Sequence, residues 1–377
     1  MSKILFISNI SNKISSFVTA SISAAHNLEL DFYQAANWQS SSKEQMTADE
    51  QEYNIKIKNI SLSRNPFAAA NLTAYKELVA LIKREKIDYI HCNTPVGGLL
   101  GRLAGKKCKV KKVIYQAHGF HFYKGAPLLN WLLYYPVEKW LAHRTDAMIT
   151  INREDYDLAK GKMKLRNGGK VYYVPGVGID NSKFSKASID RAVKRRELGI
   201  PEDAVLLLSV GELNSNKNHE TVIRAIADTN VYYIIAGRGE LQQDLEKLIE
   251  AQNLHDRVKL LGFRNDVKEL YEVADIFVFP SFREGLSVAV MEAMASGLPC
   301  VASKIRGNTD LLEDGNGGFL CDPRDVSDFA EKIHILASDT QLRETMGSAN
   351  RVTIQKFSTE NVIREMENIY AAEFLSR

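Results

Sequence analysis

Short apolar stretches alternate with longer amphipathic stretches along nearly the whole chain, and this alternation constrains the fold more than any other feature. Strands separated by helical patterns predict parallel sheets with helices packed on them. The pattern restarts after residues 174–180, Val-Pro-Gly-Val-Gly-Ile-Asp, where proline and glycine interrupt it. A chain of 377 residues is long enough for two cores of ordinary size. We therefore predict an α/β protein with two doubly wound domains in tandem, joined by a hinge at 174–180.

The expected elements follow from the apolar periodicity. The first half is expected to have strands at 3–8, 87–92, 112–117 and 147–151, with its clearest helices at 69–86 and 128–143. The second half is expected to have strands at 204–210, 231–236, 258–261, 275–280, 299–303 and 318–322, with helices beginning near residues 217, 240, 267, 287 and 326. A final helix is expected at 359–374. These elements give an N-terminal domain at 1–176, a C-terminal domain at 177–357 and a C-terminal segment at 358–377 whose helix should pack onto a domain surface.

Composition and the N-terminal sequence exclude several classes of protein. The four cysteines are widely spaced with no Cys-x-x-Cys pair, which argues against a zinc ribbon and against a dense disulfide framework. No window approaches the roughly 18 apolar residues of a membrane span, and the apolar run after Lys3 is too short for a signal peptide. We therefore expect a soluble protein of a reducing cytoplasm.

Positive charge is concentrated in the first half of the chain. Residues 1–180 carry 25 Lys and Arg against 15 Asp and Glu, and the density is highest from Arg102 to Lys112. A basic run of this kind can bind the phosphates of anionic lipid or nucleic acid, or can be a solvated turn. No nucleic-acid-binding module accompanies it, so no nucleic-acid partner is expected. Arg102, Lys106 and Lys107 are the candidates for a lipid-facing surface.

The stretch 127–136, Pro-Leu-Leu-Asn-Trp-Leu-Leu-Tyr-Tyr-Pro, is unusually apolar and aromatic for a short helix beside a basic run. Packing into the core is the simpler interpretation. The alternative is a face that docks on a membrane, with Trp131 and Tyr134 at the depth of the lipid headgroups.

The segment 279–299 combines the end of a strand, a loop and a short helix. An apolar strand is expected to end at Pro280. Ser287 is a favourable N-cap residue for the helix that follows, and Gly297 is a favourable residue at which that helix ends.

The loop of this segment predicts a site for an anion. The backbone N–H groups of Gly285, Leu286 and Ser287, with the positive end of the helix dipole, would bind one. Two carboxylates, Glu284 and Glu292, lie beside it in the sequence. Carboxylates suit such a site only when they accept hydrogen bonds from hydroxyl groups, which a sugar offers.

The Glu-Gly-Leu-Ser and Ala-Ser-Gly-Leu-Pro parts of 279–299 resemble the signature of family 4 retaining glycosyltransferases. Segments similar to the branch that builds capsule and exopolysaccharide repeat units also occur in order, at 117–125, 146–155, 211–218 and 262–267. The resemblance covers essentially the whole chain. It implies the GT-B fold, in which two Rossmann-like domains face each other across a cleft. In that fold the last helix, here expected within 358–377, crosses back to the N-terminal domain. The resemblance also implies a nucleotide-sugar donor, bound mainly by the C-terminal domain, with no metal or other cofactor.

The same resemblance implies roles for individual residues. Glu292 would hold the ribose hydroxyls, Glu284 would meet hydroxyls of the donor sugar, and Lys217 would neutralise the departing diphosphate. A histidine in the position of His118 faces the donor sugar, and Arg238 is a nucleotide contact. The donor-binding candidates are Glu212, Lys217, Arg238, Glu284, Gly285, Leu286, Ser287 and Glu292, and the catalytic candidates are His118, Lys217 and Glu284. The resemblance favours a front-face route, in which the leaving phosphate takes the acceptor proton, over a nucleophilic carboxylate.

The sequence departs from the family pattern at two places. Glu212 stands where many relatives have an arginine beside the phosphates, so Lys217 is expected to act alone. The loop 8–12, Ser-Asn-Ile-Ser-Asn, lacks the twin glycines that often let it approach the donor. The candidates for the acceptor or membrane side are Asn9, His121 and Lys124, together with Arg102, Lys106 and Lys107.

Two patterns that suggest a metal are explained more simply. Asp155-Tyr156-Asp157 matches the metal-binding pattern of the other major glycosyltransferase fold, but a charged first helical turn explains it better. His118 and His121 could form a metal pair, but no third ligand is identifiable.

The resemblance, together with the anion site predicted in 279–299, indicates a retaining glycosyltransferase that moves a hexose or N-acetylhexosamine to a growing glycan. The resemblance alone implies that the donor is a UDP-sugar. The expected acceptor is a sugar on undecaprenyl diphosphate, which would place the enzyme peripherally at the inner face of the cell membrane. A GDP-sugar is the alternative donor. A non-catalytic, nucleotide-sugar-binding scaffold subunit and a sugar-nucleotide epimerase are the alternative functions.

Overall fold

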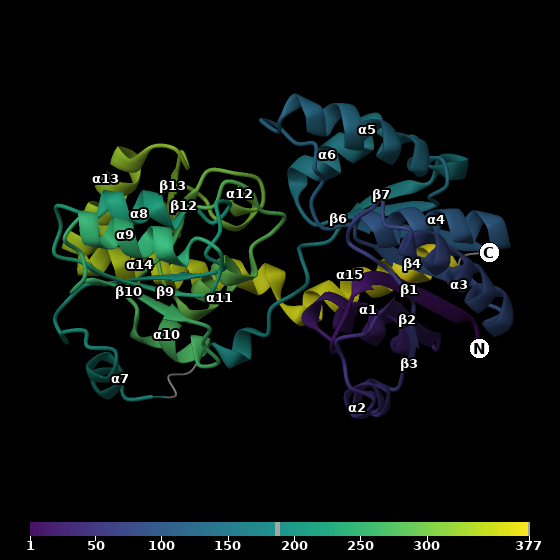
Figure 1. Cartoon of the computed structure of the whole chain (residues 1–377), viewed down its shortest axis with the longest axis horizontal. Helices are drawn as coiled ribbons and strands as arrows, with labels where there is room; N and C mark the ends of the chain where they lie inside the picture. The colour runs from purple at the N-terminus through teal and green to yellow at the C-terminus, as the bar shows by residue number, and fades with distance from the viewer. Residues whose placement is uncertain (185–188, 376–377) are drawn as a thin grey trace. The chain divides into compact units, whose positions relative to one another are not determined.

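The computed structural model describes residues 1–184 and 189–375 (Figure 1). The chain divides into two compact units. Unit 1 consists of Met1–Gly178 and Thr359–Arg377, and unit 2 of Ile179–Ser358. Each unit contains one sheet in which all strand pairs are parallel. The predicted tandem of doubly wound α/β domains is confirmed.

The sheet of unit 1 has the strand order β3-β2-β1-β4-β5-β6-β7. Its strands are β1 (Lys3–Ile10), β2 (Asp31–Asn37), β3 (Lys56–Asn59), β4 (Tyr89–Asn93), β5 (Lys112–Ala117), β6 (Ala147–Thr150) and β7 (Lys170–Tyr173). Its helices are α1 (Ser16–Asn27), α2 (Lys43–Tyr53), α3 (Ala70–Glu85), α4 (Pro95–Cys108), α5 (Leu128–Ala142), α6 (Arg153–Lys162) and α15 (Thr359–Tyr370), with short turns η1 (Arg166–Gly168) and η4 (Ala371–Leu375).

The sheet of unit 2 has the order β10-β9-β8-β11-β12-β13. Its strands are β8 (Leu206–Val210), β9 (Tyr232–Ala236), β10 (Val258–Gly262), β11 (Ile276–Phe279), β12 (Cys300–Ser303) and β13 (Gly318–Cys321). Its helices are α7 (Arg191–Glu197), α8 (His219–Ala225), α9 (Gln242–Ala251), α10 (Val267–Val273), α11 (Val288–Ser296), α12 (Asn308–Leu311), α13 (Val326–Ser338) and α14 (Thr340–Thr353), with turns η2 (Asn181–Lys183) and η3 (Ile354–Phe357).

Each sheet separates two apolar cores, because successive residues of a strand point to opposite faces. In β1, Leu5 and Ile7 belong to one core of unit 1, whereas Ile4 and Phe6 belong to the other. Unit 2 repeats this division. A strand buried on both faces needs apolar residues at every position, and this explains why these strands read as continuous apolar runs.

The last helix of the chain, α15, packs on unit 1. Val362, Met366 and Ile369 are buried in the same core as Ile4 and Phe6 of β1. The phenol oxygen of Tyr370 lies 2.6 Å from Nδ1 of the buried His91 in β4. The C-terminal segment therefore covers one face of the N-terminal sheet.

Three strands of unit 1 were not predicted. The edge strands β3, Lys-Ile-Lys-Asn, and β7, Lys-Val-Tyr-Tyr, have four residues each and lack an apolar run. The strand β2 carries the buried polar residue Gln34 and ends at Asn37. Pairing with β1 holds β2 in the sheet, and the sequence of β2 alone does not indicate this pairing.

We expect Met366→Ala to destabilise unit 1 by about 2–4 kcal/mol, because it removes a fully buried side chain from the core under β1. All three tryptophans, Trp38, Trp131 and Trp140, belong to unit 1, so tryptophan fluorescence during urea unfolding reports on that unit. Ile354→Ala in the core of unit 2 is the matched control. An unchanged fluorescence midpoint in Met366→Ala would contradict the packing of α15.

Candidate functional site

The candidate site of unit 2 lies where the strand order of its sheet reverses. Strands β8 and β11 are neighbours, and the loops that follow them leave the same edge of the sheet. In open α/β sheets such an edge is where ligands bind. The loop after β8 is residues 211–218, and the loop after β11 is residues 280–287.

These two loops are tied together by hydrogen bonds. The N–H of Phe282 donates to the carbonyl of Asn216 over 2.8 Å, and the amide of Asn216 donates to the carbonyl of Arg283 over 3.0 Å. The amide of Asn218 donates to the carbonyl of Pro280 over 3.1 Å. The position of residue 217 between Asn216 and Asn218 is therefore fixed relative to the β11 loop.

Lys217 and Glu284, two predicted catalytic residues, are in direct contact. The Lys217 Nζ donates to Oε1 of Glu284 over 2.7 Å, and the side chains are 19% and 14% exposed. The same ammonium lies 4.8 Å from the ring centroid of Phe279. Each charge compensates the other in a place where water reaches little of either group.

The start of α11 presents backbone N–H groups as predicted. The Ser287 hydroxyl accepts from the N–H of Val290, which caps the helix, and Gly297 ends it with φ of 79°. Within the described parts of the chain, the N–H groups of Gly285 and Leu286 donate no hydrogen bond. These two groups and the helix dipole are oriented to bind an anion.

A cation from another part of the chain, Arg306, also lies beside this loop, and the sequence analysis did not identify it. The buried Arg306 donates from Nε to the carbonyl of Glu284 over 3.1 Å. The next residue, Gly307, has φ of 81° and approaches the carbonyl of Gly285 so closely that a side chain would collide with it. Arg306 therefore adds positive charge beside this loop, and the role of Lys217 as the residue that alone compensates the donor phosphates stays a prediction.

Glu292 is half-buried on α11, and its carboxylate is oriented by a tyrosine. The hydroxyl of the buried Tyr271, from α10, lies 3.0 Å from Oε2 of Glu292. Burial raises the pKa of Glu292 above its usual range, and the hydrogen bond from Tyr271 opposes that shift. The geometry presents an ordered acceptor to a ligand hydroxyl.

The two remaining donor-binding candidates are exposed. The Glu212 carboxylate accepts from the amide of Asn214 over 2.8 Å. Arg238 follows β9, and its guanidinium lies 5.9 Å from the ring centroid of the exposed Phe263. The sequence analysis did not identify the buried His219. Its Nε2 lies 3.2 Å from the carbonyl oxygen of Glu212, and this contact supports the loop after β8.

In unit 1, His118 follows the end of β5 as predicted, and Asn93 at the end of β4 holds its ring. The His118 Nε2 lies 2.9 Å from the Asn93 Oδ1, so Nε2 carries the proton and Nδ1 presents its lone pair. Nδ1 is buried without a hydrogen-bond partner among the described residues. Burial lowers the pKa of His118 to about 4, so the ring is neutral at neutral pH.

The side chain of Asn9 forms hydrogen bonds within unit 1. Its side-chain oxygen accepts from the N–H of Gly97 over 2.8 Å and from the hydroxyl of Thr94 over 2.9 Å. These contacts fix the start of α4. The prediction that Asn9 faces the acceptor or the membrane is not supported by this arrangement.

The predicted lipid-facing role of Arg102 is wrong. Arg102 is fully buried and forms a bidentate ion pair with Glu138 at 2.8 and 2.9 Å. Its guanidinium lies 3.8 Å from the ring centroid of Tyr115. Elsewhere in the basic run, Lys111 pairs with Asp88 and Lys112 with Glu373, whereas Lys106 and Lys107 in the last turn of α4 are exposed.

The aromatic and apolar stretch before and within α5 divides its side chains between the core and the surface. Trp131 faces the core through Phe122 and Tyr135, so it is not available to headgroups. His121 stacks on Tyr134 at 4.7 Å, and Lys124 is exposed. Core packing is wrong as the explanation of the leucines, because Leu128, Leu129, Leu132 and Leu133 are exposed.

Asp155 has a structural role. The carboxylate is buried and accepts from the N–H of Phe120 and the amide of Asn152, which fixes the loop after His118. Residues 1–184 and 189–375 contain no group of three or more His, Cys, Asp or Glu placed to hold a metal. No helix in those ranges is long and apolar enough to cross a membrane.

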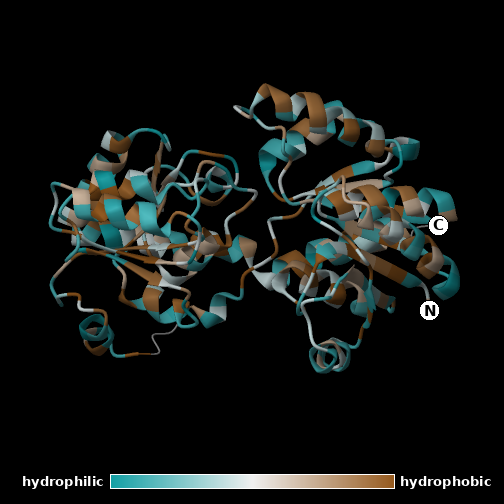
Figure 2. Cartoon of the chain, viewed as in Figure 1, coloured by the Kyte–Doolittle hydropathy of each residue, from teal (hydrophilic) through white to brown (hydrophobic). Residues whose placement is uncertain are grey.

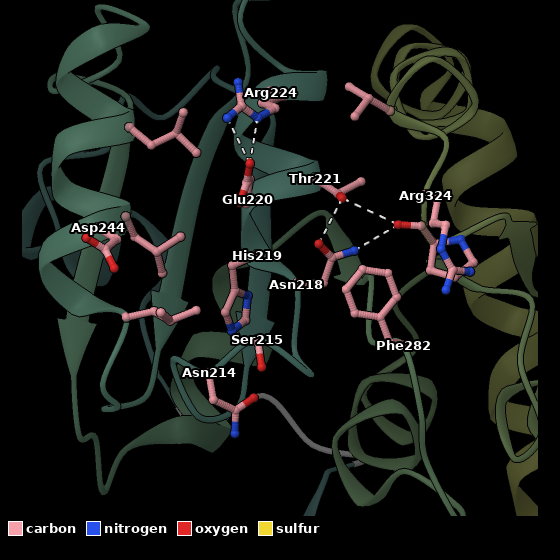
Figure 3. A pocket seen from close by; sticks show the side chains of 15 residues that line it. Asn214, Ser215, Asn218, His219, Glu220, Thr221, Arg224, Asp244, Phe282 and Arg324 are labelled. Carbon is pink, nitrogen blue, oxygen red and sulfur yellow. Dashed lines mark hydrogen bonds and ion pairs between the residues drawn. The ribbon is translucent and has the colours of Figure 1, made fainter. Parts of the chain in front are cut away.

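A cavity of about 600 Å³ lies beside the candidate site, between α8, α9 and the loop before α13 (Figure 3). Asn214, Ser215 and Phe282 line it, but Lys217, Glu284 and Glu292 do not. Among the residues that line the cavity, Arg224 forms an ion pair with Glu220, with 2.8 Å between a guanidinium nitrogen and Oε1. The cavity is therefore separate from the predicted donor-binding residues.

Replacing Glu292 by glutamine is expected to stabilise unit 2 at neutral pH, and to do so less at acid pH. Because the pKa is raised, the folded state holds a proton that the unfolded state has already lost, so stability falls as pH rises from the ordinary pKa of a glutamate to the raised one, and the full cost is present above it. Urea unfolding followed by circular dichroism at acid and neutral pH measures it. A gain that is equal at both pH values, or a loss, would contradict the burial of this carboxylate.

Asn93→Asp should raise the pKa of His118 from about 4 toward its ordinary value, because it places a negative charge beside Nε2. Asn93→Ser, which removes the hydrogen bond without adding charge, should leave the pKa low. NMR titration of the imidazole distinguishes the two. A His118 pKa near its ordinary value in the unmodified chain would refute the buried, neutral ring.

The chain is similar to known glycosyltransferases. Residues 3–152 match the "Glycosyl transferase 4-like" family model, and residues 190–353 match "Glycosyl transferases group 1". The chain is 40% identical to the putative glycosyltransferase EpsD of Bacillus subtilis, covering 83% of this chain and 84% of that one. It is 28% identical to the Escherichia coli UDP-Gal:alpha-D-GlcNAc-diphosphoundecaprenol alpha-1,3-galactosyltransferase, covering 82% of each.

The fold is that of solved glycosyltransferases. The structure of Anabaena Alr3699/HepE in complex with UDP and glucose aligns with a TM-score of 0.79 at 22% identity, covering 99% of this chain and 100% of that one. The outer core galactosyltransferase WaaB aligns with a TM-score of 0.73 at 17% identity, covering 98% and 99%. With two parallel α/β sheets of this kind and a relative 40% identical over most of its length, the chain belongs to the group 1 (family 4) retaining glycosyltransferases and has the GT-B fold.

Proposed function

We propose that this glycosyltransferase moves a hexose or N-acetylhexosamine from a UDP-sugar to a glycan linked to undecaprenyl diphosphate, in the synthesis of a bacterial surface polysaccharide. The E. coli relative is named for a UDP-galactose donor and a diphosphoundecaprenol-linked acceptor, and a structural relative was solved with UDP and glucose. A lipid-linked acceptor places the enzyme at the inner face of the cell membrane, as a peripheral protein.

The Lys217–Glu284 ion pair beside the N–H groups of Gly285 and Leu286 is the observation that carries this proposal. A bound diphosphate competes with Glu284 for the ammonium of Lys217. Once released, the Glu284 carboxylate accepts a hydrogen bond from a hydroxyl of the donor sugar. One pair of side chains thus matches a ligand with both phosphate and hydroxyl groups.

The remaining residues complete the donor site in this proposal. Glu292, oriented by Tyr271, accepts hydrogen bonds from the ribose hydroxyls. Arg306 adds positive charge at the β11 loop, and Arg238 lies toward the nucleotide. His118 contacts the donor sugar through a neutral ring, consistent with its low pKa.

The bond changes follow the front-face route. The bond between the anomeric carbon and the diphosphate oxygen breaks while the acceptor oxygen bonds to the same face of that carbon. The acceptor proton passes to the departing phosphate oxygen, and Lys217 stabilises the negative charge that develops there. Configuration at the anomeric carbon is retained.

Lys217→Gln is expected to lower kcat by about a hundredfold or more while changing the donor KM much less, because the charge that it compensates grows mainly in the transition state. Lys247→Gln, at an exposed lysine of α9, is the matched control. Initial rates at varied donor concentration measure both constants. Equal losses in kcat and in donor affinity would remove this role from Lys217.

The donor and acceptor are tested by incubating the purified chain with radiolabelled UDP-sugars or GDP-sugars and a lipid-linked disaccharide. The proposal expects label to enter the lipid fraction from a UDP-sugar alone, with retained anomeric configuration by NMR. Transfer from a GDP-sugar would correct the donor. Release of free sugar or an epimer without any acceptor would contradict the proposed transfer.

A further inference from the structure

We propose that α5 is a membrane-docking helix, and that its outward face binds the surface of an anionic lipid bilayer. This inference deepens the proposed function, on which it rests for the lipid-linked acceptor. The helix is predominantly apolar along its length (Figure 2). A surface helix of a globular protein is ordinarily polar on the side that faces solvent.

The inward face of α5 packs against other parts of unit 1. Trp131 and Tyr135, one turn apart, contact the ring of the buried Phe122. Glu138 closes the bidentate pair with Arg102, and Leu141 is buried. This spacing of three to four residues fixes which side of the helix faces the core.

The outward face carries a contiguous row of leucines. Leu128, Leu129, Leu132 and Leu133 are between 56% and 74% exposed, and Val137 and Trp140 continue the row at 47% and 46%. Since the inward face is fixed by the contacts of Trp131 and Glu138, these side chains cannot turn into the core. A clustered apolar surface of this kind indicates an interaction site.

The charges around this row favour an anionic surface. Between residues 121 and 144 the basic residues are Lys124, Lys139 and Arg144, and the single acidic residue is Glu138. Arg102 neutralises Glu138 from inside, and the nearby Glu154 accepts from the backbone N–H of Lys124. Three cations therefore flank an apolar row, which is the arrangement that binds acidic headgroups.

The end of the helix has the residues that suit a headgroup layer. The Arg144 guanidinium stacks on the half-exposed Trp140, with 3.7 Å between its carbon and the ring centroid. Tryptophan and arginine both combine an apolar body with a polar group and are favoured where hydrocarbon meets water.

The length and the proline of α5 favour a helix lying in the plane of the interface. Its 15 residues extend about 22 Å, short of the roughly 30 Å hydrocarbon core. The exposed Pro136 has no N–H, so the Leu132 carbonyl lacks its intrahelical donor. At headgroup depth water can satisfy that carbonyl, whereas in hydrocarbon it would be left unpaired.

The test is co-sedimentation of the full chain with vesicles of phosphatidylcholine containing phosphatidylglycerol, and with vesicles of phosphatidylcholine alone. We expect the chain to bind the anionic vesicles and to bind less as salt rises. The affinity of the Leu129→Gln/Leu133→Gln variant for the anionic vesicles should be lower by about tenfold or more, because two apolar side chains no longer enter the interface. Lys139→Gln should weaken binding to the anionic vesicles selectively.

The matched control is Phe67→Gln/Leu72→Gln, which removes two apolar side chains that are as exposed but lie outside α5. Its vesicle binding should equal that of the unmodified chain. If the unmodified chain does not sediment with anionic vesicles, or if both double variants bind alike, the inference is wrong. Concentration-dependent dimers that Leu129→Gln/Leu133→Gln abolishes would show that a second copy covers the row, and would also overturn it.

Failure of the docking surface is distinguishable from failure of the proposed function. Sugar transfer to a water-soluble acceptor should be unchanged in Leu129→Gln/Leu133→Gln, while transfer to an acceptor in anionic vesicles should fall. A chain that binds vesicles but transfers no sugar would leave the docking surface standing and contradict the proposed function. A chain that transfers sugar but does not bind vesicles would support the proposed function and contradict the docking surface.

Discussion

The ion pair between Lys217 and Glu284 is the interaction around which the candidate donor site is built. Two opposite charges of low exposure are held 2.7 Å apart by two loops that are themselves joined through Asn216 and Asn218. Either charge alone would be costly at such a position. A ligand that offers a phosphate to the ammonium and a hydroxyl to the carboxylate can satisfy both groups, and a nucleotide-sugar is such a ligand.

Parallel strands explain why this pair forms where it does. Because β8 and β11 are neighbours and point the same way, the loops carrying Lys217 and Glu284 must begin at one edge of the sheet. The same rule brings Asn93 and His118 together in unit 1, where Asn93 is the last residue of β4 and His118 follows the neighbouring strand β5. In both units, residues far apart in sequence meet because adjacent strands end side by side.

The sequence was sufficient for the parts of the fold and site that are encoded locally. Central strands are continuous apolar runs, and the loop with Glu284, Ser287 and Gly297 carries its capping residues within a few positions of each other. Arg306 and Tyr271 were not predicted, because their contacts with Glu284 and Glu292 arise from packing between elements 21 or 22 residues apart.

Two errors have a common cause. Arg102 belongs to a basic run, yet Glu138 on another helix draws it into the interior. The leucines of α5 have the composition of a core, yet the inward side of that helix is already occupied by Trp131 and Tyr135. Composition reports how polar a segment is, whereas its partners decide which side is buried.

Calorimetric titration of UDP, GDP and ADP into the unmodified chain and into Glu292→Ala tests the central claim most directly, because it examines the base and the ribose contact without needing the acceptor. The account predicts that UDP binds the unmodified chain in preference to GDP and ADP, and that Glu292→Ala loses this binding. Absence of nucleotide binding to the unmodified chain, or unchanged binding in Glu292→Ala, would contradict the assigned donor site.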